Sequence, residues 1–437
     1  MTAIANAFST DLVSTSGLDI FESDESSVRS YCRSFPETIE SALGSIQLST
    51  TGKEYIDFFA GAGALNYGHN EPSLKKALLD YISKDGIAHG LDFKTQAKGQ
   101  FIQTFKDQIL TPRALDYKLQ FTGPTGTNAV EAAIKLARKV TGRHNIIAFT
   151  NAFHGMSLGS LALTTNPKKR DAGGVHHSNV SFLPYENYLG ENIDSAEVAR
   201  KLLRPGSGVD RPAAFILETI QGEGGVNTAT RHWTQAIANL AKEVGALLIV
   251  DDIQAGCGRT TDFFSFESLG VNPDIVTLSK SLSGYGLPMS LVLIKPHLDV
   301  WEPGEHNGTF RGNNLAFVTA QTAILKYWST NEFSNSLKVT AEALDKKLRD
   351  FQNIGSVIDN VKLKGRGLFR GIEFTRPGLA NKVSRAAFAE GLIIETSGID
   401  DQVLKFLPPL NISNEHLDLG FEKLETAFKK LQRGHHD

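Results

Sequence analysis

The chain has 437 residues, a formal net charge of −3 at pH 7 and 21% charged residues. This near-neutral balance gives no electrostatic reason to expect nucleic acid or an anionic membrane as a partner, and no run reaches the ~18 apolar residues of a membrane-spanning helix. The length predicts a large domain with a smaller one rather than a single core.

The N-terminal region predicts a tail followed by a short structured segment. Residues 1–17 are small and polar, which favours a mobile tail. Residues 18–60 hold short apolar patches, and we expect them to pack with the smaller domain. Apolar residues at helical spacing then predict helices over Ser73–Gly86 and Thr95–Leu110.

Short apolar runs after about residue 119 predict strands separated by helices or loops. Continuous apolar runs of this kind favour an α/β fold with a mainly parallel central sheet covered by helices on both faces. We assign this sheet to a large domain over residues 61–325. The runs span residues 145–150, 213–218, 246–251, 274–279 and 290–295.

The C-terminal third predicts a second, α+β domain over residues 326–437. Helical patterns cover residues 316–328 and 336–352, and a last helix is expected over 416–432. Short strand candidates lie between these helices, over residues 361–374 and 391–397. We see no internal repeat and no low-complexity linker.

Lys280 and Asp251 are the most informative residue pair in the sequence. Each follows a predicted strand: Asp251 ends ALLIVD and Lys280 follows DIVTLS. A lysine amine and a carboxylate leaving neighbouring strand ends suit a pyridoxal phosphate site, where the amine links to the aldehyde and the acid keeps the pyridine nitrogen protonated. The alternative is a surface lysine after a buried strand.

A Gly/Thr turn precedes the helix predicted near Asn128. Thr125, Gly126 and Thr127 offer backbone N–H groups and two hydroxyls at the helix N-terminus, which together favour phosphate binding. A plain capped helix start is the alternative, because Thr and Asn also serve as N-caps.

Four further positions are candidates for the same site. Phe153 follows a strand and precedes small residues, so it can lie flat against a ring, with His154 beside it; an ordinary core aromatic is the alternative. Glu218 ends a strand before a glycine-rich turn, at the edge where doubly wound sheets bind ligands. Gln254 is placed to donate to a ring hydroxyl. Arg366, between glycines, can grip a carboxylate with two hydrogen bonds.

Taken in order, these motifs resemble the class III pyridoxal-phosphate aminotransferases, a branch of the fold type I enzymes. The resemblance covers nearly the whole chain from about Phe21. It implies that Lys280 carries the cofactor, Asp251 pairs with the ring nitrogen, Gln254 lies beside the ring hydroxyl and Phe153 stacks on the ring. It also implies that Gly126 and Thr127 hold the phosphate, and that Thr309 reaches it from a neighbouring subunit of a homodimer or higher homo-oligomer. Two positions depart from the family pattern: Asn128 replaces the common Glu, and Thr125 the common Ser.

Within the family, several segments resemble the branch that makes diaminobutyrate for ectoine biosynthesis. They are RSYCRSFP, YIDFFAGAGALNYGHN, QFTGPTGTNAVEAA, FTNAFHG and EHNGTFRGNN. The implied reaction converts L-glutamate and L-aspartate 4-semialdehyde into 2-oxoglutarate and L-2,4-diaminobutyrate. Supply of diaminobutyrate to siderophores or peptides, an ornithine or 4-aminobutyrate aminotransferase, and an aminomutase or racemase remain the alternatives.

The resemblance also implies a switch between two substrates. In family members that use glutamate, an arginine binds the α-carboxylate, and a glutamate pairs with that arginine when a terminal amine occupies the site. We assign these roles to Arg366 and Glu218 as a hypothesis. The sequence does not identify the residues that bind the α-amino and carboxylate groups of the semialdehyde.

The remaining polar motifs point to no metal. Cys32 and Cys257 are far apart and lack metal-ligand spacing, which suits a reducing compartment. The pairs His176–His177 and His435–His436 are expected to be loop and tail residues. Because no Lys or Arg precedes Arg29 and no long apolar core follows, we expect no secretory signal and a cytoplasmic location.

Overall fold

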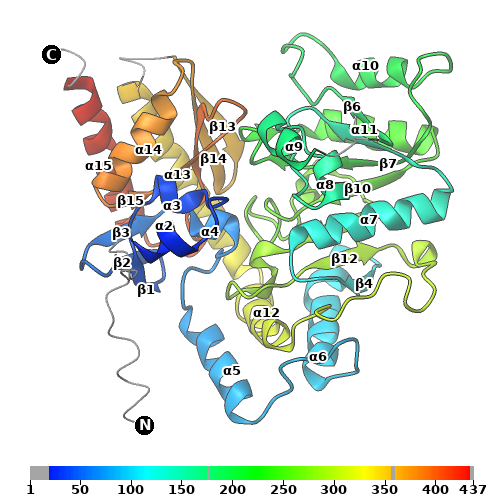
Figure 1. Cartoon of the computed structure of the whole chain (residues 1–437), viewed down its shortest axis with the longest axis horizontal. Helices are drawn as coiled ribbons and strands as arrows, with labels where there is room; N and C mark the ends of the chain where they lie inside the picture. The colour runs from blue at the N-terminus through cyan, green and yellow to red at the C-terminus, as the bar shows by residue number, and fades with distance from the viewer. Residues whose placement is uncertain (1–18, 175–177, 356–359, 434–437) are drawn as a thin grey trace.

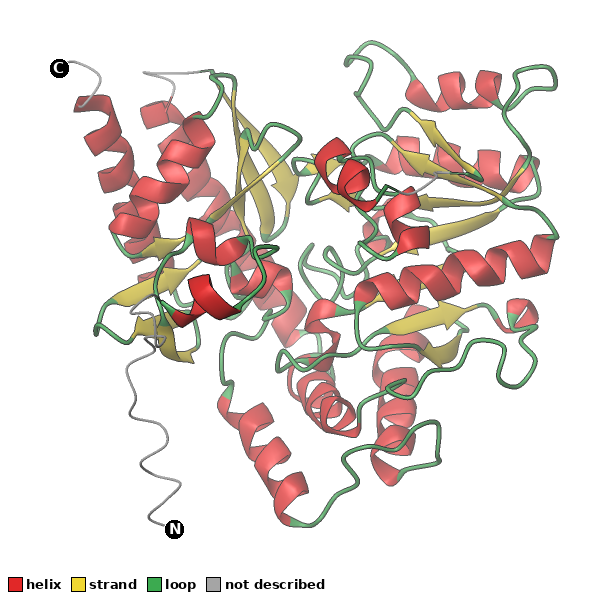
Figure 2. Ribbon diagram, viewed as in Figure 1, coloured by secondary structure: helices red, strands yellow, loops and turns green. Residues whose placement is uncertain are grey.

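The computed structural model describes residues 19–174, 178–355 and 360–433 (Figure 1). The predicted tail over residues 1–17 and both histidine pairs lie outside these ranges. Within them, no helix combines the length and the apolar character needed to cross a membrane. Figure 2 shows a large sheet with helices on both faces and, beside it, a smaller group of sheets and helices.

The large sheet has seven strands in the order β4-β12-β11-β10-β7-β5-β6. Its strands are parallel to their neighbours except β12, which runs antiparallel to β11 and β4. The predicted α/β class and mainly parallel sheet are therefore confirmed. The strands are β4 (Lys118–Phe121), β5 (Asn145–Phe149), β6 (Val180–Leu183), β7 (Pro212–Leu217), β10 (Leu247–Asp251), β11 (Ile275–Leu278) and β12 (Leu291–Ile294).

Alternate residues of the central strands explain why their sequences are continuously apolar. Ile146 and Ala148 of β5 pack in a cluster with helix α7 (Gly126–Thr141), whereas Ile147 and Phe149 pack in a different cluster with helix α11 (Arg231–Glu243). Since successive side chains of a strand point to opposite faces, a sheet covered twice needs apolar residues at every position.

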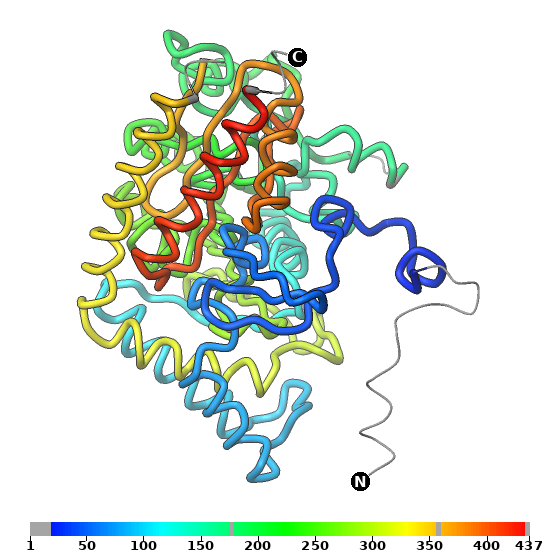
Figure 3. Tube along the Cα trace, turned by 90° about the vertical axis from the view of Figure 1, so that its left-hand side faces the viewer, coloured from blue at the N-terminus to red at the C-terminus, as the bar shows by residue number. Residues whose placement is uncertain are grey.

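The smaller part combines both ends of the chain. Strand β3 (Glu54–Asp57) runs parallel to β15 (Leu392–Ile393), with Ile56 opposite Leu392. Figure 3 shows the same N-terminal segment, in blue, beside the C-terminal helices, in orange and red. The domain boundaries at residues 60 and 325 stay predictions, and helix α12 (Asn314–Tyr327) runs across the second.

The other elements complete the two parts. The smaller part contains a four-stranded sheet β1-β2-β3-β15, a second sheet β13-β14-β17-β16, and packed helices α13, α14 and α15. Remaining bounds are α2 (Ile20–Asp24), α3 (Tyr31–Ser34), β1 (Ile39–Leu43), β2 (Ile46–Ser49), α4 (Ala60–Gly63), α5 (Pro72–Ser83), α6 (Gln96–Phe105), α8 (Leu158–Ala162), α9 (Pro167–Gly173), α10 (Ser195–Leu202), β8 (Ile220–Gln221), β9 (Asn227–Thr228), α13 (Glu332–Gly355), β13 (Val361–Arg366), β14 (Phe369–Phe374), α14 (Leu379–Ala389), β16 (Glu395–Ser397), β17 (Val403–Phe406) and α15 (Asn414–Arg433).

Candidate functional site

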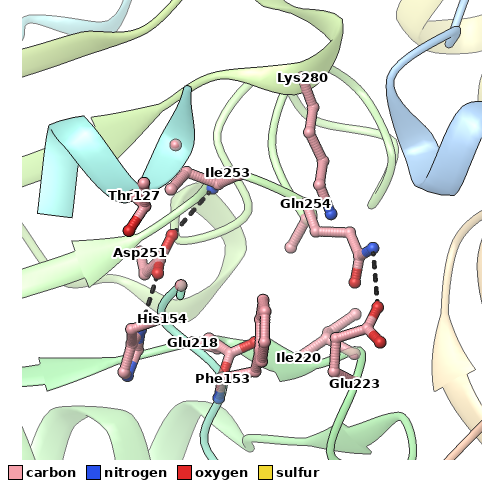
Figure 4. Close-up of a pocket in the computed structure, with 13 residues that line it drawn as sticks. Thr127, Phe153, His154, Glu218, Ile220, Glu223, Asp251, Ile253, Gln254 and Lys280 are labelled. Atoms are coloured by element: carbon pink, nitrogen blue, oxygen red, sulfur yellow. Dashed lines mark hydrogen bonds and ion pairs between the residues drawn. The ribbon is translucent and has the colours of Figure 1, made fainter. Parts of the chain in front are cut away.

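A cavity of about 170 Å³ opens where the parallel strands of the large sheet end (Figure 4). Strands β5, β7, β10 and β11 each deliver a predicted residue to it, either at the last strand position or within four residues beyond. Ligands of doubly wound sheets bind at such carboxyl edges. The lining residues are Gly126, Thr127, Phe153, His154, Gly155, Glu218, Ile220, Glu223, Asp251, Ile253, Gln254, Ala255 and Lys280.

Lys280 enters the cavity from a strained backbone position. It begins a short 3₁₀ helix after β11, and its φ of +46° lies in the left-handed region. Such a conformation costs about 1–3 kcal/mol in a residue with a side chain, and it persists only where the surroundings enforce it. Burial lowers the pKa of the Lys280 ammonium, although the charge of Glu223 opposes this shift. A larger fraction of the amine is therefore neutral than in water.

Asp251 is a buried carboxylate held by three hydrogen bonds. Nδ1 of His154 donates to Oδ2 at 2.7 Å, while the Thr277 hydroxyl and the Ile253 N–H donate to Oδ1 at 3.1 and 3.2 Å. Burial opposes the charged form of His154, but the hydrogen bond and charge of Asp251 outweigh it and raise the pKa of the imidazole. Parallel pairing of β10 with β11 places Asp251 directly opposite Thr277.

The first turn of α7 forms the cavity wall on the opposite side from Glu223 (Figure 4). Gly126 and Thr127 line the cavity, and helix geometry leaves the first N–H groups without intrahelical partners. A Cβ on Gly126 would lie 2.9 Å from Cδ1 of Ile253, so a larger residue there would require the Ile253 side chain to shift. Thr125 is exposed and does not line the cavity; its N–H and hydroxyl both donate to Oδ1 of Asn128. The Asn that departs from the family pattern therefore still caps this helix.

Phe153, Glu218 and Gln254 also lie in the cavity wall. The Phe153 N–H donates to Oε1 of Glu218 at 3.0 Å, which ties the ends of β5 and β7 together. Burial raises the pKa of Glu218 to about 8, with the charge of His154 opposing and that of Asp251 reinforcing the shift. Nε2 of Gln254 donates to the Ala62 carbonyl at 3.0 Å.

Glu218 and Arg366 do not form an ion pair in this conformation, and their pairing when a terminal amine is bound stays a prediction. Arg366 donates to the carbonyls of Ser265 at 2.6 Å and Ala229 at 3.4 Å and does not line the cavity. Arg366 is the last residue of β13, and its guanidinium is directed to those two carbonyls. The sequence from Lys364 to Glu373 does not by itself show which way the Arg366 side chain points.

A buried ion cluster that the sequence did not reveal lies beside Lys280 instead. Nζ of Lys405, on β17, lies 2.8 Å from Oε1 of Glu223 and 2.9 Å from Oε1 of Glu395. Burial opposes ionisation of Glu223, but the charges of Lys405 and Lys280 outweigh it and lower its pKa to about 2. Burial raises the pKa of Glu395 to about 7, with Lys405 opposing. The one sequence signal is a lysine inside the apolar run VLKFL.

Thr309 lies away from the cavity of its own chain. It is exposed, and its carbonyl accepts a hydrogen bond from Nε2 of His89 at 2.8 Å. Its predicted role in a neighbouring subunit stays a prediction. Across the described residues, no group of three or more His, Cys, Asp or Glu side chains is arranged to hold a metal ion.

The sequence matches known proteins over almost its full length. The model of the family "Aminotransferase class-III" matches residues 30–428. Diaminobutyrate–2-oxoglutarate transaminase of Bordetella parapertussis is 54% identical over 94% of each chain, and that of Halalkalibacterium halodurans 51% identical over 96% of this chain and 98% of its own. Ornithine aminotransferase from Toxoplasma gondii, whose structure reveals partial occupancy of PLP at the active site, superposes with a TM-score of 0.84 at 26% identity, covering 100% of this chain and 99% of that one.

Proposed function

Because the chain belongs to the class-III aminotransferases, we propose that it transfers the amino group of L-glutamate to the terminal aldehyde of L-aspartate 4-semialdehyde. The products are L-2,4-diaminobutyrate and 2-oxoglutarate. Relatives bearing the name diaminobutyrate–2-oxoglutarate transaminase, at 51–54% identity over at least 94% of this chain, support this choice of substrates. From the structure, the observation that carries an aminotransferase function is the meeting of Lys280, Asp251 and the start of α7 in one cavity.

The cavity fits pyridoxal phosphate, the cofactor of this family. The missing side chain at Gly126 leaves room at a helix N-terminus, where backbone N–H groups and the Thr127 hydroxyl would hold a phosphate. Phe153 and Ile253 would cover the two faces of the ring, and Asp251 would meet its nitrogen. When bound, the cofactor supplies an aldehyde that exchanges amines and a ring that accepts electrons.

Lys280, Asp251 and His154 then have separate roles in the proposal. Lys280 Nζ, whose pKa is lowered by burial, would take a proton from the reacting carbon of the amine donor and deliver it to the carbon that the cofactor's aldehyde supplies. Asp251, held by three hydrogen bonds, would pair with the protonated ring nitrogen, because a buried carboxylate needs a cation or several donors. His154 holds Asp251 in place through its hydrogen bond at 2.7 Å.

The ion cluster supplies the substrate switch that the sequence assigned to Glu218 and Arg366. Glutamate presents a carboxylate next to its reacting carbon, whereas diaminobutyrate, reacting at its terminal amine, presents none. We assign binding of that carboxylate to Lys405, which Glu223 and Glu395 neutralise in its absence. Lys405 is fully buried, so leaving its charge unpaired would be costly.

A second copy of the chain completes the proposed enzyme. The loop holding Thr309 packs against residues 87–93, with the rings of His89 and Phe310 5.1 Å apart. Exposed apolar side chains gather on these two loops, with Phe93 and Phe310 each 68% exposed. Such a patch favours burial by a partner, and Thr309 would thereby approach the partner's cavity.

Initial rates with alternative amine donors test the proposed substrate. Each of four amines is assayed as the donor, with 2-oxoglutarate as the acceptor. They are diaminobutyrate, ornithine, 4-aminobutyrate and lysine. We expect kcat/KM for diaminobutyrate to exceed the others by about tenfold or more, equivalent to about 1.4 kcal/mol of transition-state stabilisation. A higher value for ornithine or 4-aminobutyrate would reassign the substrate, and formation of an isomer without 2-oxoglutarate would indicate an aminomutase. The pathway that receives the diaminobutyrate, ectoine synthesis in the proposal, is outside this assay.

A further inference from the structure

A second lysine approaches the cavity from helix α9. Nζ of Lys169 lies 4.4 Å from the centroid of the Phe153 ring, which itself lines the cavity. Lys169 also lines a small pocket that shares Phe153 and Glu223 with the main cavity and reaches Ile399 of the smaller part. Figure 1 shows α9 at the edge of the large part that faces the smaller part.

The ammonium of Lys169 differs from the Lys405 and Arg366 cations, both of which are hydrogen-bonded to protein oxygens. Lys405 is shared by two carboxylates, and Arg366 donates to two carbonyls. Among the described residues, no hydrogen bond or ion pair joins Lys169 Nζ to a partner, although its side chain is half-buried. Its charge nevertheless contributes to lowering the pKa of Glu223, after Lys405 and Lys280.

The two proposed amine donors share one feature that a fixed cation can recognise. Glutamate reacts at its α-carbon, and its side-chain carboxylate lies three bonds away. Diaminobutyrate reacts at its terminal carbon, and its α-carboxylate also lies three bonds away. Asp251 and Glu223 both line the cavity, so an incoming carboxylate needs a cation to offset repulsion and lost hydration.

We propose that Lys169 binds the carboxylate three bonds from the reacting carbon in both donors and in 2-oxoglutarate. This inference rests on the proposed function, and it adds a specificity-determining residue outside the cavity lining. Lys405 and Lys169 then bind different carboxylates. Lys405 binds the one next to the reacting carbon, and Lys169 binds the one three bonds away. A lysine bonded to a carboxylate in a partly buried site contributes about 1.5–3 kcal/mol, or roughly 10–100-fold in binding.

Binding of glutarate to the cofactor-loaded enzyme gives the first test, since this dicarboxylate has no amine to react. We expect Lys169→Met, which keeps the chain length without the charge, to weaken glutarate binding at least about tenfold by calorimetric titration. Lys169→Arg should restore most of the affinity. Lys168→Met, at an exposed neighbouring position, should bind glutarate like the wild type. Unchanged affinity in Lys169→Met, or no glutarate binding by the wild type, would overturn the proposal.

A comparison of two donors separates carboxylate binding from support of the Phe153 ring. The compound 1,3-diaminopropane is diaminobutyrate without its carboxylate. We expect Lys169→Met to lower kcat/KM for diaminobutyrate at least about tenfold and that for 1,3-diaminopropane less than about threefold, with the absorption spectrum of the bound cofactor unchanged. Equal losses for both amines would assign Lys169 to positioning the ring. Wild-type protein that does not turn over diaminobutyrate would refute the proposed function, whereas glutarate binding would still decide the role of Lys169.

Discussion

Burial of the Glu218 carboxyl group in the site should make the stability of the fold depend on pH. Its pKa of about 8 lies above the ordinary value of 4.5, because burial disfavours its charged form. Between these values the folded chain holds a proton that the unfolded chain has released. Since the folded state binds more protons, this group lowers stability as pH rises through the window.

Glu218→Gln should therefore stabilise the cofactor-free protein increasingly from pH 4.5 to pH 8. Glutamine keeps an oxygen that accepts from the Phe153 N–H but has no proton to lose. Its advantage can grow by at most about 1.4 kcal/mol per pH unit, the free energy of one proton. Urea unfolding of both proteins at several pH values measures it. A constant difference across the window would show that Glu218 has an ordinary pKa.

Lys280→Ala should abolish transfer, with a loss of at least about 10³-fold in kcat, because it removes both the proposed covalent attachment and the proton carrier. Borohydride reduction followed by mass spectrometry provides a second measurement. The wild type should retain the cofactor on the peptide containing Lys280, and the variant should retain none. Lys168→Ala serves as the control. A variant that still fixes the cofactor on another lysine would contradict the assignment.

At the scale of elements, the start of α7 should tolerate no side chain at Gly126. A Cβ there would lie within 2.9–3.4 Å of three Ile253 side-chain atoms. We expect Gly126→Ala to weaken pyridoxal phosphate binding at least about tenfold in a fluorescence titration. Gly99→Ala on α6 is the matched control, because a Cβ there meets nothing within 4 Å. Equal cofactor affinity in both variants would show that the phosphate lies elsewhere.

The sequence predicted the elements that local patterns determine. The five apolar runs became β5, β7, β10, β11 and β12, and the helix expected near Asn128 begins at Gly126. The antiparallel direction of β12 was not visible, since an apolar run has no direction. Strands β4 and β6 were missed because each is only four residues long and has one buried residue, so neither forms a continuous apolar run.

Strand-end residues could be predicted and long-range pairs could not. Asp251, Lys280, Glu218 and Phe153 leave strands whose carboxyl ends meet at one edge, so the topology brings them together. Lys405 meets Glu223 across 182 positions of sequence, through packing of the smaller part on the large one. No local pattern contains that contact, so the sequence alone does not place Lys405 beside Glu223.

At the scale of the whole molecule, the exposed loops around Thr309 predict a homodimer. Phe310→Glu places a charge in the proposed interface, so we expect it to shift the sedimentation profile towards monomer and to weaken pyridoxal phosphate binding. Val339→Glu on α13 changes a side chain of equal exposure, 68%, away from these loops. It should stay dimeric. A Phe310→Glu protein that remains dimeric would place the interface elsewhere.

The two carboxylates on Lys405 come from different parts of the fold. Glu395 faces Lys405 across neighbouring strands of one small sheet, so this contact travels with that sheet. Glu223 belongs to the turn between β8 and β9, in the large part. A rotation that separated the smaller part from the large part would break the Lys405–Glu223 ion pair and keep the Lys405–Glu395 ion pair. The carboxylate of Glu223 would then remain unpaired on the side of the cavity. Re-forming the Lys405–Glu223 ion pair, or binding another cation beside Glu223, would neutralise that charge again.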